Sequence, residues 1–470
     1  MGSCAKERMA DVQTRSSVLS YHAPAAAASR RRWWVAGGWV FWLVVTVNAA
    51  IVTALWLNDG GVSAVHDLGT LLTSVGRITG LLGAYLLLVQ VLLIARLPWI
   101  ERMAGFDRLT VWHRLNGKVC LYLVLAHVVF ITAGYALIDK ISLKAEIQRL
   151  LQSYPGMVTA TVGTVMIVLV AVSSFVIVRR RLRYEAWYLV HLLAYAGIVF
   201  AWFHELPTGN EFITNATASA YWTGLYLATL ALLVAFRVAQ PALRAWWHRL
   251  RVVEVTAETP NVVSVHIAGR KLDRLGARAG QFFLWRFLSS GRWWESHPFS
   301  LSRAPDGRSL RITVKHSGDF SKRIGEIRPG TRVIAEGPFG TFTDLVRRRE
   351  RVALIAGGIG ITPIRALLEE MRGDLVLVYR VLRDEDIVFG QELRKLADSK
   401  GITLHFVVGD HASPDGEKLL SPEHLREMVP DIAEREVYIC GPPAMSDLIE
   451  KNVRQTRVPR KYIHTERFAL

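Results

Sequence analysis

The sequence predicts a multi-domain membrane protein with a six-helix all-α transmembrane bundle, an antiparallel β-barrel domain and an α/β nucleotide-binding domain, in that order. Six long apolar runs fill the first half of the 470-residue chain and end near Ala239. Short β-rich runs separated by turn residues follow, which is the pattern of an antiparallel barrel. The last part alternates strands with helices, as parallel α/β sheets do. These observations divide the chain into a membrane half and a soluble half.

The composition agrees with this division. Hydrophobic residues make up 51% of the chain and the mean hydropathy is +0.24, which is too apolar for a soluble protein and too polar for a membrane bundle alone. The net charge is +17, but the basic residues cluster beside the apolar runs, which favours membrane lipid over nucleic acid as a partner. The three cysteines (Cys4, Cys120 and Cys440) lack metal-ligand spacing, so neither an iron–sulfur centre nor a disulfide framework is predicted.

The N-terminal region is predicted to change from disorder to helix near residue 30. Residues 1–29 are rich in alanine and serine and are predicted to form a disordered cytoplasmic N-terminus. Ser29–Arg32 resembles a twin-arginine export signal, but the following run, Trp33–Leu57, is about 25 residues long and too long for a signal peptide. Residues 30–240 are therefore predicted to form the bundle. Its further spans are predicted at residues 75–95, 112–138, 157–178, 186–203 and 218–239.

The linkers between these runs predict the orientation. Alternate linkers are rich in arginine, and the sets are Arg30–Arg32, then Arg96, Arg102 and Arg108, then Arg179–Arg181 with Arg183, and finally Arg237, Arg244, Arg249 and Arg251. The other linkers are acidic or mixed. Because cytoplasmic loops carry the excess of basic residues, we predict a multi-pass protein of the plasma or inner cell membrane with both termini in the cytoplasm.

Four histidines are the candidate metal ligands of the bundle. His113 and His127 lie in the third run, and His191 and His204 lie in and just after the fifth. Spacings of 14 and 13 residues correspond to roughly 20 Å along a helix, within a hydrocarbon core of about 30 Å. Two such helices side by side would form two stacked pairs of imidazoles, which suit two b-type haems. For a lone intramembrane histidine, the alternative is a hydrogen bond between helices.

The 13-residue spacing carries a further expectation. At about 100° per residue it leaves His204 roughly 140° away from the face that carries His191. The sequence therefore predicts a local distortion near His204, such as a π-bulge or an unwound last turn, and Pro207 makes a helix end there plausible.

Arg77 opens the second span from its predicted outer side. Its guanidinium would neutralise a haem propionate or hold an anionic reduced acceptor, and we therefore treat it as a candidate catalytic residue. The alternative, an interfacial arginine that extends towards water, has equal weight.

Two motifs in the barrel region suit a flavin. In His297-Pro298-Phe299-Ser300, the Phe299 ring would cover the isoalloxazine and the Ser300 hydroxyl would bond its polar edge. Downstream, Lys315 is followed by Gly318, Phe320 and Ser321, and this Gly-x-x-Ser pattern offers backbone N–H groups and a hydroxyl to a pyrophosphate.

The last part of the chain carries two turns that suit a dinucleotide. Gly357, Gly358 and Gly360, with Thr362 and Pro363, follow a strand and open a helix, where backbone N–H groups favour a phosphate. Cys440-Gly441-Pro442 follows another strand. A small thiol and a tight turn there would let a nicotinamide approach the flavin, and the alternative is a structural turn with a buried cysteine.

Two arginines predict the choice of nucleotide. Arg380 and Arg383 follow the second strand of the α/β region, where an acidic residue would normally bind the ribose 2′-hydroxyl. Arginine at this place favours a 2′-phosphate, and therefore NADPH over NADH.

Together, the spaced histidines, His297–Ser300, Glu336-Gly337-Pro338-Phe339-Gly340, the glycine turn and Cys440–Pro442 resemble the NADPH oxidase/ferric reductase superfamily in a prokaryotic-type form, from about residue 70 to the C-terminus. The resemblance implies a six-helix dihaem domain fused to a ferredoxin-reductase-like module, with FAD bound by residues 250–345 and NADPH by residues 350–470. It also implies that His113 and His191 hold the inner haem, that His127 and His204 hold the outer one, and that residues 297–300 and 318–321 contact the flavin.

Two positions depart from the family pattern. Related soluble reductases often have arginine where His297 stands, so the flavin phosphate would instead depend on Arg303 or Lys315. Many members end on an aromatic ring that covers the flavin until nicotinamide displaces it, and Phe468 matches that ring as a candidate catalytic residue. Here Ala469 and Leu470 follow it.

The expected function is transmembrane electron transfer from cytoplasmic NADPH, through FAD and two haems, to an extracytoplasmic acceptor. Dioxygen is favoured because Arg77 would hold a small anion, and a ferric chelate is the alternative. A redox-sensing channel is a remote alternative, since the spans lack arginines at every third position. A dihaem cytochrome reduced by quinone or ascorbate would not need the soluble half. Accessory subunits are not evident, because no SH3-type module, EF-hand or proline-rich tail is visible.

Overall fold

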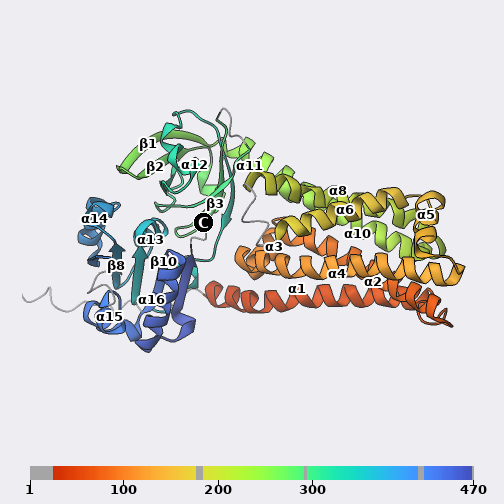
Figure 1. Ribbon diagram of the computed structural model, residues 1–470. Coiled ribbons are helices and arrows are strands. Elements are labelled where there is room, and N and C mark those ends of the chain that lie inside the picture. The colour runs from red at the N-terminus through yellow and green to blue at the C-terminus, as the bar shows by residue number, and fades with distance from the viewer. Residues whose placement is uncertain (1–24, 176–183, 290–293, 411–417, 468–470) are drawn as a thin grey trace, which may run out of the picture.

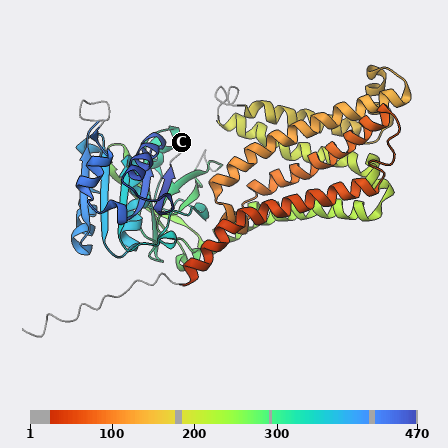
Figure 2. The same ribbon diagram turned by 90° about the horizontal axis from the view of Figure 1, so that it is seen from below.

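The computed structural model describes residues 25–175, 184–289, 294–410 and 418–467, and places a helical bundle end-on against a soluble module (Figure 1). The helices run lengthwise away from the module. Seen from below, helix α1 (Ala25–Asn58) extends along the whole bundle and its N-terminal end reaches the module (Figure 2). The module therefore lies at one end of the bundle, beside the first turns of α1 and not along its flank.

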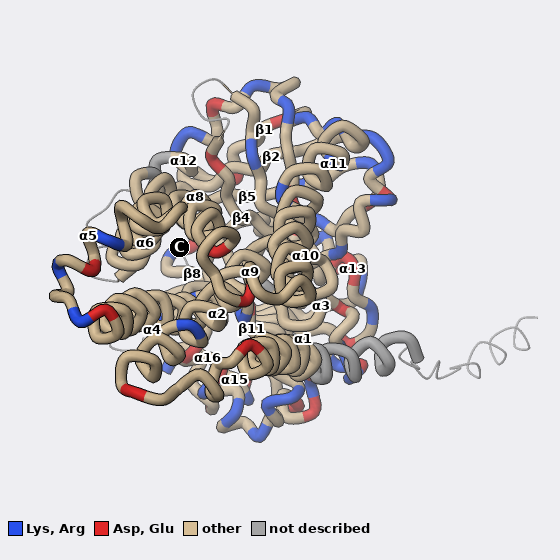
Figure 3. The backbone as a smooth tube through the Cα atoms, turned by 90° about the vertical axis from the view of Figure 1, so that its right-hand side faces the viewer, with Lys and Arg blue, Asp and Glu red and all other residues tan. Residues whose placement is uncertain are grey.

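Within the part of the chain that the structure describes, six helices are long and apolar enough to cross a membrane. They are α1, α2 (Leu68–Ile94), α4 (Phe106–Asp139), α6 (Met157–Ser174), α8 (Tyr184–Thr208) and α10 (Ala216–Val234). Viewed along the bundle from the end away from the module, the helices show few charged residues along their length, and the charges gather at their ends and on the module (Figure 3). The six predicted spans are confirmed as helices.

Several helices extend beyond the apolar runs that predicted them. Helix α2 begins at Leu68 because Asp67 and Thr70 form a reciprocal capping box. The described part of helix α1 starts at Ala25, and residues 1–24, most of the segment predicted to be disordered, lie outside the described residues. Four shorter helices were not predicted. They are α3 (Pro98–Ala104), α5 (Leu143–Ser153), α9 (Asn210–Thr214) and α11 (Gln240–His248).

Glycines hold the membrane helices in two close pairs. A Cβ atom on Gly76 of α2 would lie 2.8 Å from the Ile131 side chain of α4, and one on Gly163 of α6 would lie 2.7 Å from the Gly197 carbonyl of α8. Small residues of this kind let helix backbones approach closely in lipid, where the hydrophobic effect does not drive association. The bundle therefore contains an α2–α4 pair and an α6–α8 pair.

The first part of the module contains two antiparallel sheets of three strands each. The first sheet has the order β1-β2-β5 and the second β4-β3-β6. The strands are β1 (Arg251–Thr259), β2 (Val262–Ala268), β3 (Phe282–Phe287), β4 (His297–Ser300), β5 (Ser309–Lys315) and β6 (Val333–Phe339). The two sheets share one apolar core and meet at two isolated bridges, Arg251 with Arg332 and Leu301 with Ile312. The predicted closed barrel is therefore not observed among the described residues.

The second part of the module is a parallel five-stranded sheet with the order β11-β10-β7-β8-β9. Its strands are β7 (Val352–Gly357), β8 (Leu375–Val381), β9 (Thr403–Val408), β10 (Glu436–Gly441) and β11 (Ile463–Arg467), and the main helices beside it are α13 (Ile361–Glu370), α14 (Gly390–Lys400), α15 (Pro422–Met428) and α16 (Pro443–Gln455). Two apolar clusters pack on opposite faces of the sheet, which makes the predicted α/β domain a three-layered unit.

A buried carboxylate ties the edge of this sheet together. Glu436, at the start of β10, is fully buried and accepts hydrogen bonds from the backbone N–H groups of Arg348 and Arg349. Its other oxygen lies 2.6 Å from His464 Nε2 of β11. One side chain thus joins the segment before β7 to β10 and β11.

We expect Glu436→Ala to lower the free energy of unfolding by about 3 kcal/mol, because it leaves buried donors without an acceptor. Thermal unfolding of the full-length protein in detergent measures this loss. The control is Glu434→Ala, which removes an exposed carboxylate paired with Arg351 and should change stability by less than about 0.5 kcal/mol. Equal effects of the two variants would show that Glu436 has no special role.

Candidate functional site

The four histidines come together as the two pairs that the sequence predicted. The ring centroids of His113 and His191 are 6.0 Å apart, and those of His127 and His204 are 6.3 Å apart. A nitrogen–metal bond of about 2 Å, with roughly 1 Å from that nitrogen to the ring centre, gives about 6 Å between two rings that bind one metal from opposite sides. Each pair therefore has the separation of two trans imidazole ligands.

Hydrogen bonds at Nδ1 orient all four rings. In each case the partner is an oxygen atom, and the contacts are His113 to Gln90 O (3.2 Å), His127 to Gly76 O (2.8 Å), His191 to Ser174 Oγ (3.3 Å) and His204 to Ala201 O. A carbonyl only accepts, so Nδ1 of three of these rings is the donor and Nε2 carries the lone pair. A metal-ligating histidine has this tautomer when its other nitrogen is bonded to the protein.

Helix α2 carries none of the four histidines, yet its residues hold two of the imidazole rings in place. A Cβ atom on Gly80 would overlap the His127 ring, so only glycine leaves room for it there. Near the inner pair, the Gln90 side-chain amide donates to the His113 carbonyl at 2.8 Å, and Asn116 donates to the Gln90 side chain at 2.8 Å. Sequence reasoning missed these residues, although buried polar side chains and repeated glycines in a membrane span were the available signal.

The predicted distortion at His204 is wrong. Helix α8 is α-helical from Tyr184 to Thr208, with Pro207 inside it. The prediction assumed that both rings point straight out from the helix axis. Instead, His204 Nδ1 bonds the Ala201 carbonyl one turn earlier on its own helix, so the direction of the side chain absorbs the angular offset. The structure does contain a π-helical turn, but it lies at Ala235–Ala239, between α10 and α11.

The surroundings of the histidine pairs fit a large apolar group. In the most apolar stretch of each spanning helix, only 11% of the residues are buried inside the protein on α4 and on α8, against 39% on α2. Among the described residues no group of three or more histidine, cysteine, aspartate or glutamate side chains is placed to hold a metal. Two ligands hold a bare ion poorly, whereas a porphyrin supplies the remaining ligands to its iron. The residues therefore fit two bis-histidine haems.

Arg77 already has carboxylate partners. Its Nη2 atom lies 2.6 Å from Glu211 Oε1 and 3.4 Å from Asp59 Oδ2, and it also donates to the Asp59 carbonyl. The Glu211 side chain is only 3% exposed. This ion-paired arrangement differs from both alternatives that the sequence left open, because the guanidinium is neutralised within the protein.

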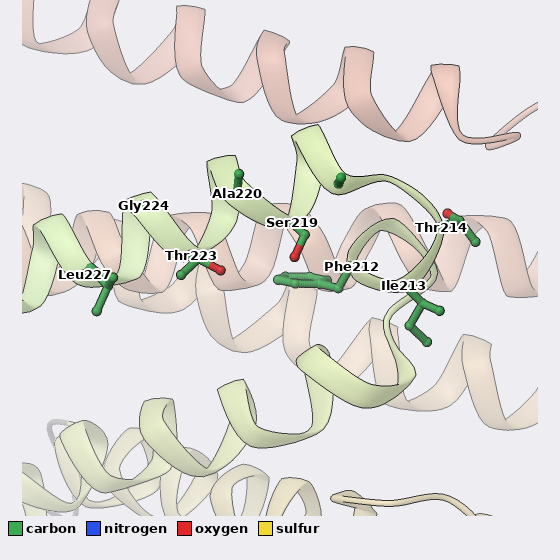
Figure 4. Close-up of a pocket in the computed structure, with 9 residues that line it drawn as sticks. Phe212, Ile213, Thr214, Ser219, Ala220, Thr223, Gly224 and Leu227 are labelled. Carbon is green, nitrogen blue, oxygen red and sulfur yellow. The ribbon is translucent and has the colours of Figure 1, made fainter.

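A pocket of about 770 Å³ lies along α9 and α10 (Figure 4). Its polar side chains are the hydroxyls of Thr214, Ser219 and Thr223, and Phe212 and Leu227 supply apolar surface. None of the residues that line it carries a charged side chain.

The flavin motif forms strand β4, and its rings lie against the short helix α12 (Asp319–Lys322), which follows β5. His297 stacks on Phe320 with centroids 3.8 Å apart, and the Phe299 and Phe320 rings are nearly parallel at 6.2 Å. Ser300 is buried, and the Trp285 indole donates to the Phe299 carbonyl at 2.9 Å. The motif residues of 297–300 and 318–321 are therefore neighbours in space.

In the loop that was predicted to bind pyrophosphate, the Ser321 hydroxyl bonds the backbone of the loop itself. Ser321 Oγ accepts from the backbone N–H groups of Ser317 and Gly318, both at 2.8 Å, and donates to the Gly318 carbonyl at 2.9 Å. These three bonds fill the hydrogen-bonding capacity of the hydroxyl. Ser321 thus shapes the loop, while Lys315 is exposed at the end of β5. Arg303, the other candidate for the phosphate, lies 3.8 Å from Glu369.

The two nucleotide motifs touch at the carboxyl edge of the parallel sheet. The glycine turn follows β7 and leads into α13, and a Cβ atom on Gly360 would overlap the Cys440 carbonyl of β10. Gly358 has φ +52° and open space beside it. Thr362 and Pro363 are buried in the first turn of α13. Ligands of open α/β sheets bind at such an edge.

Cys440 is fully buried. This agrees with the alternative interpretation of its motif, a structural turn with a buried cysteine. Burial raises the pKa of its thiol well above the ordinary value, so the sulfur is neutral. Phe468, the candidate ring over the flavin, lies outside the described residues. Gly441 and Pro442 lie in the turn between β10 and α16.

Arg380 and Arg383 are placed differently after β8. Arg380 donates to the Gly409 carbonyl at 3.2 Å, and partial burial lowers the pKa of its guanidinium. Arg383 is exposed and pairs with Glu385 at 2.7 Å and Asp386 at 3.5 Å. A 2′-phosphate at Arg383 would compete with these carboxylates.

Three family models match successive parts of the chain. Residues 79–202 match the ferric reductase like transmembrane component, residues 247–343 match an FAD-binding domain, and residues 354–451 match the oxidoreductase NAD-binding domain. The first match contains both histidines of α4 and His191, and stops two residues before His204. The second and third contain the flavin and nucleotide motifs described above, apart from the C-terminal ring.

Individual relatives cover smaller parts of the chain. NADH-cytochrome b5 reductase 1 of Laccaria bicolor is 28% identical over 34% of this chain, and ferredoxin–NADP reductase B of Sorangium cellulosum is 27% identical over 36%. The chain spans 56% and 77% of the lengths of these two relatives. A solved FAD/NAD-binding domain of nitric oxide dioxygenase from Vibrio cholerae has 24% identity and a TM-score of 0.40, over 47% of this chain and 98% of that one.

The order of the three matched domains agrees with the order of helices, paired antiparallel sheets and parallel sheet in the structure. The chain therefore combines a ferric reductase-like transmembrane component with FAD-binding and oxidoreductase NAD-binding domains, and in this combination it is similar to the NADPH oxidase/ferric reductase superfamily.

Proposed function

We propose that the protein passes electrons from cytoplasmic NADPH through FAD and two b-type haems to an acceptor on the opposite side of the membrane. The observation that carries this proposal is the pair of histidine sites, each at the ring separation of trans ligands, in a bundle joined end-on to FAD- and NAD-binding domains. When bound, FAD accepts two electrons as a hydride and releases them singly, and haem iron carries single electrons.

The residues of the chain position these groups. His113 and His191 would hold the haem nearer the module and His127 and His204 the other, while the Nδ1 hydrogen bonds leave Nε2 of these rings available as a ligand. His297 and Phe299, with Phe320, would supply aromatic surface to the flavin, and Gly318 and Lys315 would contact its phosphates. The glycine turn at Gly357–Gly360 admits the phosphates of the nucleotide close to the backbone.

Arginine residues support both the proposed orientation in the membrane and the proposed preference for NADPH. Arg96 and Arg244, from two of the arginine-rich linkers, contact the module, which supports a cytoplasmic module and cytoplasmic termini. Arg380 and Arg383 at the end of β8 support NADPH over NADH.

The ion pairs of Arg77 affect the argument about which electron acceptor the protein uses. The sequence argument for dioxygen relied on a guanidinium that holds a small anion, and the carboxylates of Asp59 and Glu211 remove that support. The same pairing favours dioxygen for another reason, since a neutral diatomic needs no cation, whereas an anionic ferric chelate does. We propose dioxygen, with superoxide as product, and keep a ferric chelate as the second candidate.

The decisive experiment uses purified full-length protein in lipid nanodiscs. Difference spectra follow haem reduction by NADPH and by NADH, while superoxide and ferrous iron are assayed in parallel. We expect NADPH to reduce the haem and superoxide to exceed ferrous iron. If dithionite reduces the haem and neither nucleotide does, the electron route from the flavin is wrong.

Gly80→Ala tests the seat of the outer haem. The added methyl group overlaps the His127 ring, so we expect the haem content to fall from two per chain towards one, with the inner haem spectrum retained. Haem quantification and low-temperature spectra measure this. Gly83→Ala is the matched control one turn along α2, because its Cβ would meet neighbours at an ordinary 3.4 Å. Loss of haem in the control, or full content in Gly80→Ala, contradicts the assignment.

Arg77 is tested by a single and a double variant. Arg77→Gln leaves the buried Glu211 unpaired, so we expect stability to fall by about 3 kcal/mol, and Arg77→Gln with Glu211→Gln to recover most of it. Thermal unfolding and superoxide assays are compared for both. If the guanidinium acts on an anionic product instead, the double variant regains stability but not superoxide output.

A further inference from the structure

The bundle and the module meet at more than their covalent connection. The chain passes from α10 through a π-helical turn into α11 and then into β1. A single connection of this kind would act as a hinge, and domains joined in that way move relative to each other unless a further contact holds them. The structure shows such a contact at β6.

The contact centres on the carboxylate of Glu336. One oxygen pairs with the guanidinium of Arg96, which follows the C-terminal end of α2, and the other lies 3.8 Å from Arg286 of β3. The Arg96 and Glu336 side chains are only 16% and 11% exposed. Arg96 therefore forms an ion pair with Glu336 across the junction, whereas Arg286 is an ion-pair partner of the same carboxylate within the flavin domain.

Two further interactions support the contact. Arg244 of α11 donates to the carbonyl of Gly337, the residue after Glu336. The Arg96 guanidinium also lies 5.9 Å from the centre of the Phe339 ring. The Glu336–Phe339 segment, which the sequence singled out without giving it a role, is thus the surface that the bundle contacts.

This contact joins the sheet that carries the flavin strand to the end of the helix that bonds His113. On the module side, β6 pairs with β3, and β3 pairs with β4, which carries His297–Ser300. On the bundle side, Arg96 follows the same helix as Gln90, whose carbonyl and side chain both bond His113. The two ends of the contact are therefore rigidly connected to the two redox sites.

We propose that Arg96 and Glu336 form the docking contact that fixes the flavin strand relative to the inner histidine pair, and that Arg96 is a positioning residue for electron transfer between them. The inference rests on the proposed function. Because the pair is shielded from water, removal of one partner leaves a charge that favours undocking. Small displacements of reacting groups carry large costs in rate.

The test separates flavin chemistry from transfer into the bundle. Arg96→Gln should slow NADPH-driven haem reduction by about tenfold or more, while reduction of ferricyanide, a soluble acceptor that takes electrons at the flavin, should stay within about twofold. Arg286→Gln is the matched control, since it removes a partner of the same carboxylate inside one domain, and should leave both rates near wild type. Equal losses in the two variants, or none in Arg96→Gln, would overturn the proposal.

Exchanging the charges of Arg96 and Glu336 gives an independent test. Arg96→Glu should lose transfer, and Arg96→Glu with Glu336→Arg should restore it. If Glu336→Arg prevents folding of the flavin domain, ferricyanide reduction is lost as well and the Arg96→Gln comparison decides. A distance between spin labels at Arg108→Cys and Arg328→Cys, two exposed positions, reports docking without any electron transfer.

The spin-label distances also separate the two proposals. In the wild type we expect one narrow distribution, and in Arg96→Gln a broad one. If the wild type reduces ferricyanide but never its haem, the proposed function fails while a narrow distribution still upholds docking. An unchanged distribution in Arg96→Gln overturns the docking contact regardless of haem reduction.

Discussion

The orientation of the imidazole rings is the constraint on which the bundle depends. A ring can offer Nε2 to a metal only when Nδ1 is satisfied elsewhere, and in lipid no water is available to do this. The chain solves the problem with carbonyl oxygens that are already part of helices, such as those of Gly76 and Gln90. This solution requires α2 to lie very close to α4, and the glycines of α2 provide that approach.

The soluble module also brings separate segments of the chain together at its candidate sites. Gly360 packs on the Cys440 carbonyl, so the glycine turn and the Cys440–Pro442 turn share one boundary that only a small residue allows. The neighbouring β domain brings residues 297–300 and 318–321 together through stacked rings and not through a continuous strand pairing. Each candidate site is thus assembled where two separate segments meet.

The sequence predicted most helices and strands correctly, but it predicted few of the contacts between them. Long apolar runs predict spans because a helix needs about 20 such residues to cross a bilayer, whereas the start of α2 depends on the polar pair Asp67 and Thr70. Most β strands followed from local patterns, although β4 and β11 did not. Closure of the two antiparallel sheets depends on pairing between distant strands, and among the described residues two isolated bridges join them. The carboxylate partners of Arg77 lie 18 and 134 residues away, beyond the reach of any local pattern.

Helix α2 has a consequence for the redox properties of the bundle. It accepts the Nδ1 bond of His127 through Gly76 and that of His113 through Gln90, so one rigid rod holds a ring of each pair. Hydrogen bonds to a ligand set the electron-donating strength of that ligand and hence the midpoint potential of its metal. With a haem at each pair, as proposed above, a slide or rotation of α2 would change the hydrogen bonds of both pairs together, so a helix without ligands would act on both potentials at once.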